Sequence, residues 1–229
     1  MQTANRFRLG LATLSVASLG LLTTPVGAAP SGTLNLANCS GQGVTITASS
    51  VVFAGNCIQT GAGTNVSTSF GNLLPSVTGT IANLPVTPPG NPFMVFVVGG
   101  QNVNFLLTGT GPGVNNTVCS GTFDPNAPSC SIFAGSPFIL SPGAGGTIVR
   151  LAAHGTVSDA NGTSNWNGTF SANFANLTPL DIRNMFVNNG TLSVTTFNGS
   201  FAITASAAIN SSFAVNGVFA INRGFAIIP

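Results

Sequence analysis

Apolar and polar residues alternate along residues 165–175, and this alternation constrains the fold more than any other feature of the chain. The apolar residues fall on one set of positions, at Trp166, Gly168, Phe170, Ala172 and Phe174. The intervening positions carry Asn, Thr and Ser. Because successive side chains of a β-strand point to opposite faces, the pattern predicts a strand with an aromatic face in the core and an amide and hydroxyl face in water.

Residues 149–158 alternate in the same way, and the segment that joins them to the next strand contains Asn161-Gly162, which favours a tight hairpin. A second hairpin is expected around Gly99-Gly100. Further strands are expected at 33–37, 44–48, 66–70, 76–84 and 138–140. We therefore expect an all-β protein, an antiparallel β-sandwich that occupies 29–229 as a single domain. The alternative is two small β units divided near the prolines at 85–92.

One helix is predicted within this β-rich chain. Thr178 suits the N-cap, Pro179 suits the first helical position, and Asp181 lies near the positive end of the helix dipole. The run Asn188-Asn189-Gly190 supplies a stop. We expect a short helix near 179–187.

The end of the chain repeats a Phe-Ala-Ile or Phe-Ala-Val phrase at 201, 213, 219 and 225. A six-residue spacing is typical of a hexapeptide β-helix, but the repeat is too short to bury a core by stacking. Two amphipathic strands, over 201–209 and 213–221, explain the same pattern, and a meander is the preferred interpretation.

Residues 1–28 have the layout of a secretory signal peptide. Arg6 and Arg8 precede an uncharged apolar run, and Val26-Gly27-Ala28 offers small residues for cleavage. The apolar run of fourteen residues, 9–22, is shorter than the roughly 20 that span a bilayer. We expect export and cleavage after Ala28 or Ala29, with no transmembrane segment in the mature chain.

Charge is scarce, at 3% of the residues, with five Lys or Arg and three Asp or Glu. Clustered cations are needed for nucleic-acid binding by counterion release, so this class of partner is excluded. Removal of the expected signal peptide takes away two arginines and leaves three cations against three carboxylates, which cancel. Neutral amides and hydroxyls must then keep the exported chain in solution.

The four cysteines fall into two local pairs, Cys39 with Cys57 and Cys119 with Cys130. Four cysteines allow three pairings, and spacing alone does not decide between them. We expect disulfides within each local pair, because each pair brackets a loop rich in Gly, Asn and Pro. The close Cys and His spacing of a structural zinc site is missing from the sequence. With a signal peptide, disulfides predict an oxidising compartment outside the cytoplasm.

The sequence offers little for catalysis. His154, the single histidine, lies on the polar side of its expected strand, and a triad with Asp124 or Asp159 would have to be assembled by the fold. The three aspartates are too scattered to predict a glycosidase pair. Residues 159–165 resemble a calcium loop only loosely, because they carry a single carboxylate. We expect no enzyme, catalytic residue, cofactor or metal.

Two other functions fit parts of the pattern. A glycan-binding module would require an exposed aromatic strip, whereas alternation places Trp166 with Phe170 and Phe174 in the core. An outer-membrane β-barrel would also alternate, but its interfaces carry aromatic girdles, and this chain has one Trp and no Tyr.

Several motifs occur in an order that resembles a known group. They are 91–93, the Cys119/Cys130 loop, 136–140, 155–159, 166–170 and the Thr178-Pro179 segment. Over roughly 91–203 the chain resembles uncharacterised exported bacterial β-proteins that often end in a PEP-CTERM sorting tail. It departs from them by lacking the Pro-Glu-Pro motif, the apolar helix and the basic end. The resemblance implies no activity.

Neutral amide-rich surfaces and missing catalytic groups together favour one function. We expect a secreted, non-enzymatic structural or adhesion protein at the cell exterior or in the periplasm, with cell-surface or matrix contacts. A secreted glycan-binding module is the first alternative, and the outer-membrane barrel is the second.

Overall fold

The computed structural model describes residues 28–86, 90–111, 118–119, 129–133, 136–143, 145–188 and 190–205. Its strands are Ser31–Asn38 (β1), Val44–Ile46 (β2), Val51–Phe53 (β3), Cys57–Thr60 (β4), Asn65–Thr68 (β5), Gly71–Leu73 (β6), Thr78–Ile81 (β7), Pro92–Val98 (β8), Gln101–Thr110 (β9), Cys130–Ser131 (β10), Phe138–Gly143 (β11), Gly146–Asp159 (β12), Gly162–Ala175 (β13), Leu192–Val194 (β14) and Asn198–Ala205 (β15). A 3-10 turn lies at Ala54–Asn56, and an α-helix, α1, at Pro179–Val187. The expected all-β class with one short helix is confirmed for the described residues.

The hairpin of β12 and β13 is the longest feature of the fold. Its two strands have 14 residues each and pair antiparallel in register from Gly146–Ala175 to Asp159–Gly162. The turn falls on Ala160-Asn161, one residue earlier than the Asn-Gly dipeptide suggested, and Gly162 begins β13 with φ at 146°. The alternation in the sequence therefore located this hairpin correctly.

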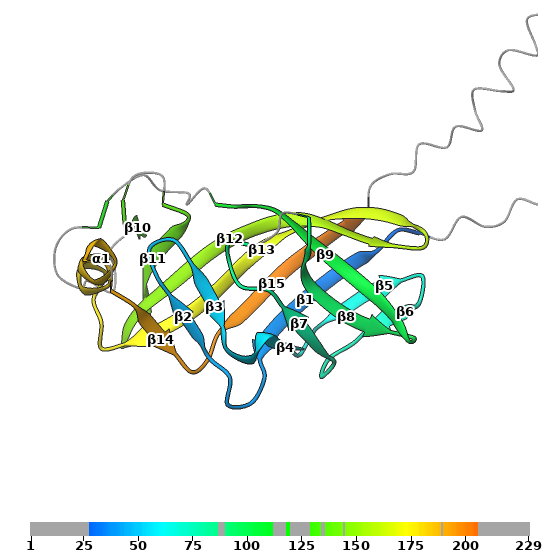
Figure 1. The fold of residues 1–229 in the computed structure, drawn as a ribbon, viewed down its shortest axis with the longest axis horizontal. Helices are drawn as coiled ribbons and strands as arrows, with labels where there is room; N and C mark the ends of the chain where they lie inside the picture. Colours follow the sequence, from blue (N-terminus) through cyan, green and yellow to red (C-terminus); the bar gives the residue numbers. More distant parts are fainter. Residues whose placement is uncertain are drawn as a thin grey trace, which may run out of the picture.

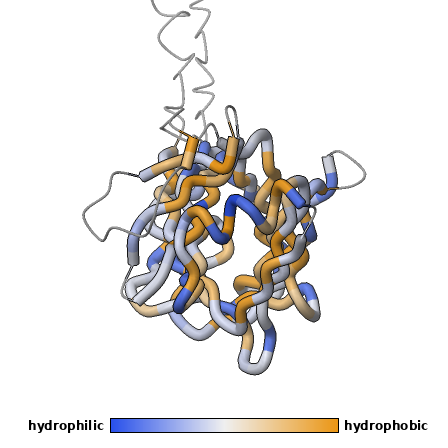
Figure 2. Tube along the Cα trace, turned by 90° about the vertical axis from the view of Figure 1, so that its left-hand side faces the viewer, coloured by the Kyte–Doolittle hydropathy of each residue, from blue (hydrophilic) through white to orange (hydrophobic). Residues whose placement is uncertain are grey.

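The main sheet closes on itself. Its order runs β12-β13-β15-β1-β4-β7-β8-β9, and β9 pairs back onto β12, so eight antiparallel strands form a barrel. Viewed along the long axis, the chain passes round a common centre (Figure 2). We expected a β-sandwich from the sequence, but the main sheet of the structure closes into a barrel and is not clearly a two-layer sandwich. Side chains alternate inward and outward in both architectures, so the alternation did not distinguish them.

One edge of β12 serves two neighbours in succession. Its first part, Gly146–Leu151, pairs with β11, and its last part, 153–158, pairs with β9. The part beyond the barrel is covered by a three-stranded sheet of β14, β2 and β3, which lies beside the β11 to β13 end in Figure 1. The long hairpin therefore belongs both to the barrel and to a local two-layer region.

Aromatic side chains fill the barrel. The Trp166 ring packs edge-on against Phe105 and Phe201, with centroids 6.3 and 5.5 Å away, and is stacked with Phe93 at 6.4 Å. Phe170 meets Phe201 at 4.8 Å. Trp166 is 1% exposed, as the alternation predicted. These rings form the centre of the core.

Local signals determine the bounds of α1. The Thr178 hydroxyl accepts from the Asp181 backbone N–H at 3.1 Å, and the Asp181 carboxylate accepts from the Thr178 N–H at 2.9 Å, which completes a capping box. Ile182 and Phe186 are buried one turn apart, and Phe186 is stacked on Phe138 at 5.8 Å. The predicted helix over 179–187 is confirmed.

The other expectations have mixed outcomes. Strands occur at all of the expected places among the described residues, but β3, β4, β6, β10 and β14 were not foreseen, and the expected strand over 213–221 lies outside the described residues. On either side of the prolines at 85–92, β7 and β8 pair in the same sheet. Of the C-terminal strands, 201–209 corresponds to β15, which the structure describes to Ala205. The expected signal peptide, except for residue 28, and the later Phe-Ala repeats lie outside the described residues.

Candidate functional site

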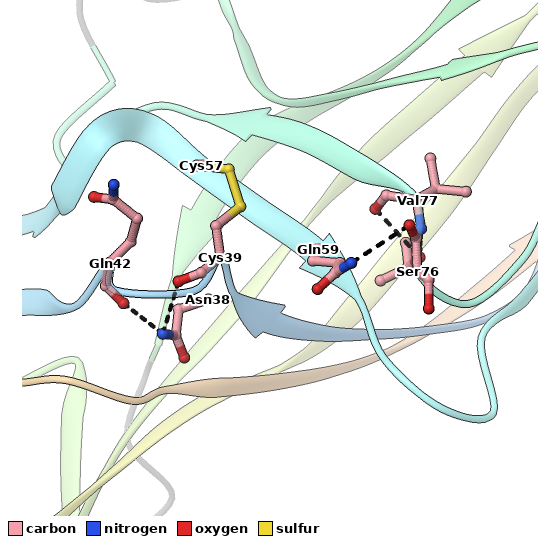
Figure 3. The surroundings of a disulfide bond; sticks show 8 residues. Asn38, Cys39, Gln42, Cys57, Gln59, Ser76 and Val77 are labelled. Atoms are coloured by element: carbon pink, nitrogen blue, oxygen red, sulfur yellow. Dashed lines mark hydrogen bonds between the residues drawn. A yellow bond between two sulfur atoms is a disulfide. The ribbon is translucent and has the colours of Figure 1, made fainter.

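The four cysteines form the two disulfides that were expected, Cys39–Cys57 and Cys119–Cys130. The first joins the end of β1 to the start of β4. Beside it, the Asn38 amide donates to the Cys39 carbonyl at 3.1 Å and to the Gln42 carbonyl at 2.5 Å (Figure 3). The same amide donates to the carbonyl of Thr195 at 2.9 Å. The disulfide and the hydrogen bonds of Asn38 together hold the segment 39–57 against the barrel.

His154 lies on the outward face of β12 and is exposed. Its ring lies over Gly109 of β9, where an added Cβ would come 2.8 Å from the imidazole. Within the described part of the chain, the ring makes no hydrogen bond or ion pair with a serine or an aspartate. The triad considered from the sequence is therefore not assembled from described residues, and Asp124 lies outside them.

The two described aspartates serve local structure at opposite ends of β13. The Asp159 carboxylate accepts from the backbone N–H groups of Ser69 at 2.6 Å and Asn161 at 2.8 Å. Asp181 caps α1, and its pKa is lowered first by the Thr178 hydroxyl and then by the Thr178 backbone N–H. The 14 residues of β13, about 45 Å when fully extended, lie between the two aspartates in the chain, and no contact joins their carboxylates, so these two do not form a glycosidase pair. Among the described residues, no group of three His, Cys, Asp or Glu is placed to hold a metal.

Described aromatic side chains do not form an exposed strip. Trp166 and most of the described phenylalanines are buried. Among the described aromatic residues only Phe133 is exposed, at 44%. The stacking platform that the glycan-binding alternative required is therefore not built from the described aromatic rings.

Polar side chains instead cover the outside of four neighbouring strands, β12, β13, β15 and β1. We call this surface the amide face. It consists of four cross-strand rows: Thr156, Asn165 and Thr204; His154, Asn167, Ala202 and Thr33; Ala152, Thr169, Ser200 and Asn35; Arg150, Ser171, Asn198 and Ala37. Each of these residues is exposed or half-buried. Because strands lie about 5 Å apart and alternate residues about 7 Å apart, the face is a regular array of mostly neutral hydrogen-bonding groups, with one arginine and three alanines among them.

A shallow depression lies on the amide face. Its polar wall is formed by Asn35, Thr169, Ser171, Asn198 and Ser200, and Arg150 stands at its side. The Ser200 hydroxyl donates to the Asn35 side-chain oxygen at 2.9 Å, and the Asn35 amide donates to the Ala62 carbonyl at 3.0 Å. These bonds hold Asn35 in place. The depression can bind neutral hydroxyl-rich groups, with one guanidinium available for an anionic oxygen.

The sequence located half of the amide face. Alternation along β12 and β13 placed Arg150, His154, Asn165 and Asn167 on a polar side. It did not bring Asn35 and Ser200 to them, because β1 lies more than 100 residues before β13 in the chain. The buried Leu34 and Leu36 on either side of Asn35 were the available signal for its outward direction.

Within the described residues, no helix is long and apolar enough to cross a membrane. Comparison with protein-family models, curated proteins and solved structures gives no match.

Proposed function

We propose that this chain is an exported, non-enzymatic structural or adhesion protein, and that the amide face makes its contacts. The face carries the proposal because it is a broad array of neutral amides and hydroxyls with a single arginine. Such a surface forms many weak hydrogen bonds with hydrated, uncharged material, and it lacks the charge that would steer one particular ion.

Two further observations support a position outside the cytoplasm. Two disulfides are compatible with an extracellular or periplasmic location. The outward residues of β13 are Asn, Thr and Ser, whereas a barrel surrounded by lipid carries an apolar outer band. The polarity of β13 therefore supports an exterior that contacts water.

The depression around Asn35 favours a glycan-binding module as the second candidate. Amides, hydroxyls and a guanidinium hydrogen-bond to sugar hydroxyls and to uronic acid carboxylates. The two candidates differ in stoichiometry: an adhesive surface has many weak contacts, whereas a glycan module has one saturable site for a defined sugar.

The first experiment is fractionation of cells that produce the full chain, with mass spectrometry of the recovered protein. We expect a mature N-terminus close to residue 29, both disulfides, and recovery from the periplasmic or external fraction. Intact, reduced chain in the cytoplasm would contradict export.

The second experiment compares two double variants in a cell-envelope attachment assay. Asn165→Asp with Asn167→Asp adds two charges to the amide face, and Asn72→Asp with Asn102→Asp adds two at exposed positions of β6 and β9. We expect attachment to fall about tenfold for the first pair only, because a carboxylate loses hydration when it is covered. Equal effects would disprove a role of this face. Saturable binding to one polysaccharide, competed by its free sugar, would favour the glycan candidate.

A further inference from the structure

A cavity of about 300 Å³ lies where the neighbours of β12 change from β11 to β9. β9 leaves the hairpin at Thr110, and β11 begins at Phe138, opposite Leu151. Among the described residues, no third strand lies between these two strands. The cavity therefore results from the way in which one edge of β12 pairs first with β11 and then with β9.

The opposite side of the cavity is closed by a two-residue bridge. The Val51 N–H donates to the Leu84 carbonyl at 3.1 Å, and the Leu84 N–H donates to the Val51 carbonyl at 2.8 Å. This bridge holds the start of β3 against the segment after β7. Hydrogen bonds fix the wall, so the cavity is preformed.

The lining combines apolar and neutral polar side chains. The apolar walls come from Val51, Leu84, Val86, Leu107, Phe138 and Leu151. Neutral polar side chains stand among them at Ser49, Ser50, Asn91, Thr108 and Thr110. None of the described lining residues is ionisable.

Strand β9 adds backbone groups to the lining. Its ladder with β8 ends at Leu106, whereas β9 itself continues to Thr110. The β8 side of residues 107–110 therefore borders the cavity in place of a strand. An edge of this kind offers N–H and C=O groups to whatever enters.

We propose that this cavity binds an uncharged, mostly apolar small molecule with one hydrogen-bonding group. Its volume lies at the lower end of the range for ligand pockets, and its lining mixes apolar walls with a few polar groups, as such pockets do. The described lining favours an uncharged ligand, because none of its residues would pair with a charge after desolvation. The site is independent of the amide face.

The test uses two probes that differ by one charge. N-Phenyl-1-naphthylamine is neutral, and 8-anilino-1-naphthalenesulfonate has the same rings with an added sulfonate. Fluorescence titration of the disulfide-bonded protein is expected to show one saturable site for the neutral probe, with affinity at least about tenfold higher than for the sulfonate. No saturable binding, or equal affinity for both probes, would overturn the proposal.

Two cavity-filling variants locate the site. Ala48→Phe adds a ring at one lining position of the cavity, and Leu107→Phe enlarges a lining side chain on β9. Ala160→Phe, at the exposed turn between β12 and β13, adds the same ring away from the cavity and from the amide face. We expect affinity for the neutral probe to fall at least about tenfold in the filled variants that retain the wild-type circular dichroism spectrum, and to be unchanged in Ala160→Phe. Retained binding in either folded filled variant would place the probe elsewhere and contradict the assignment.

Discussion

The indole N–H of Trp166 donates to the carbonyl oxygen of Leu106, at 3.2 Å, from the neighbouring part of the barrel wall. The same N–H also reaches the Thr156 carbonyl at 3.1 Å. These bonds occur where the pairing of β9 with β12 shifts register between His154 and Gly155. A bulge leaves backbone groups without their ladder partners, so the largest ring of the core also satisfies polar groups at the closure of the barrel.

Gly155→Ala is expected to destabilise the protein by about 2–3 kcal/mol. A Cβ at this position would overlap the Leu106 carbonyl oxygen and would lie 2.8 Å from the Trp166 ring. Urea unfolding followed by the fluorescence of Trp166 measures the change. Gly61→Ala is the control, because its Cβ would be no closer than 3.7 Å to Asn35, and a similar loss there would contradict the explanation.

The capping box predicts a pH-dependent contribution from Asp181. Hydrogen bonds from Thr178 lower the pKa of this carboxyl below its ordinary 3.8, so its stabilisation is complete above that value and is lost as the pH falls through the lowered pKa. The difference in unfolding free energy between wild type and Asp181→Asn should be constant from about pH 5 to 8 and shrink below about pH 4. A difference that grows in acid would contradict this sign.

Thr178→Ala removes the other half of the capping box and should cost about 1 kcal/mol at neutral pH. The loss follows because the Asp181 backbone N–H and one carboxylate oxygen both lose the hydroxyl as a partner. Thermal unfolding by circular dichroism measures it. Thr178→Ser keeps the hydroxyl and should retain most of the stability, whereas equal losses would assign the effect to packing of the threonine methyl group.

Replacing both Cys39 and Cys57 by Ser should lower the free energy of unfolding by about 3 kcal/mol. The bridge closes a loop with a sequence separation of 18, so its removal releases chain entropy in the unfolded state. Chemical denaturation of the oxidised proteins measures the change. Dithiothreitol should then destabilise the variant less than the wild type, and equal sensitivity would show that this disulfide contributes little.

Asp159→Asn should cost about 1 kcal/mol, because an amide offers one acceptor where the carboxylate serves two backbone donors, of Ser69 and Asn161. Urea unfolding is the measurement. Asn161→Ala is the control, since its side chain reaches only the Ala28 carbonyl, at 3.4 Å. A larger loss in the control would assign the stability of this loop to the asparagine.

The parts of the fold that were predictable are those with local causes. The helix α1 follows from Thr178, Pro179 and Asp181, which act within one turn, and the β12–β13 hairpin follows from a strict period of two. Barrel closure was not predictable, because it depends on β9 meeting β12 across more than 40 residues. The strands β3 and β14 have three residues each, too few to show a period.

The same distinction applies to the candidate site. Asn165 and Asn167 were recognisable as outward from their own strand, and the two disulfides followed from local pairing. The amide face as a surface depends on β15 lying between β13 and β1, an order that no short window of sequence contains. The cavity was equally hidden, since it results from two strands diverging along one edge of β12.

The sharing of β12 and β13 between the barrel and the two-layer region has a consequence for proteolysis. If either region unfolds, β12 and β13 are lost from the other region as well, so we expect the chain to unfold in one cooperative step. A protease needs an extended, released segment, and such a segment then becomes available only when the whole fold is lost. For the exported protein that we propose, which would be away from intracellular chaperones, this common hairpin would then determine how long the fold survives proteolysis.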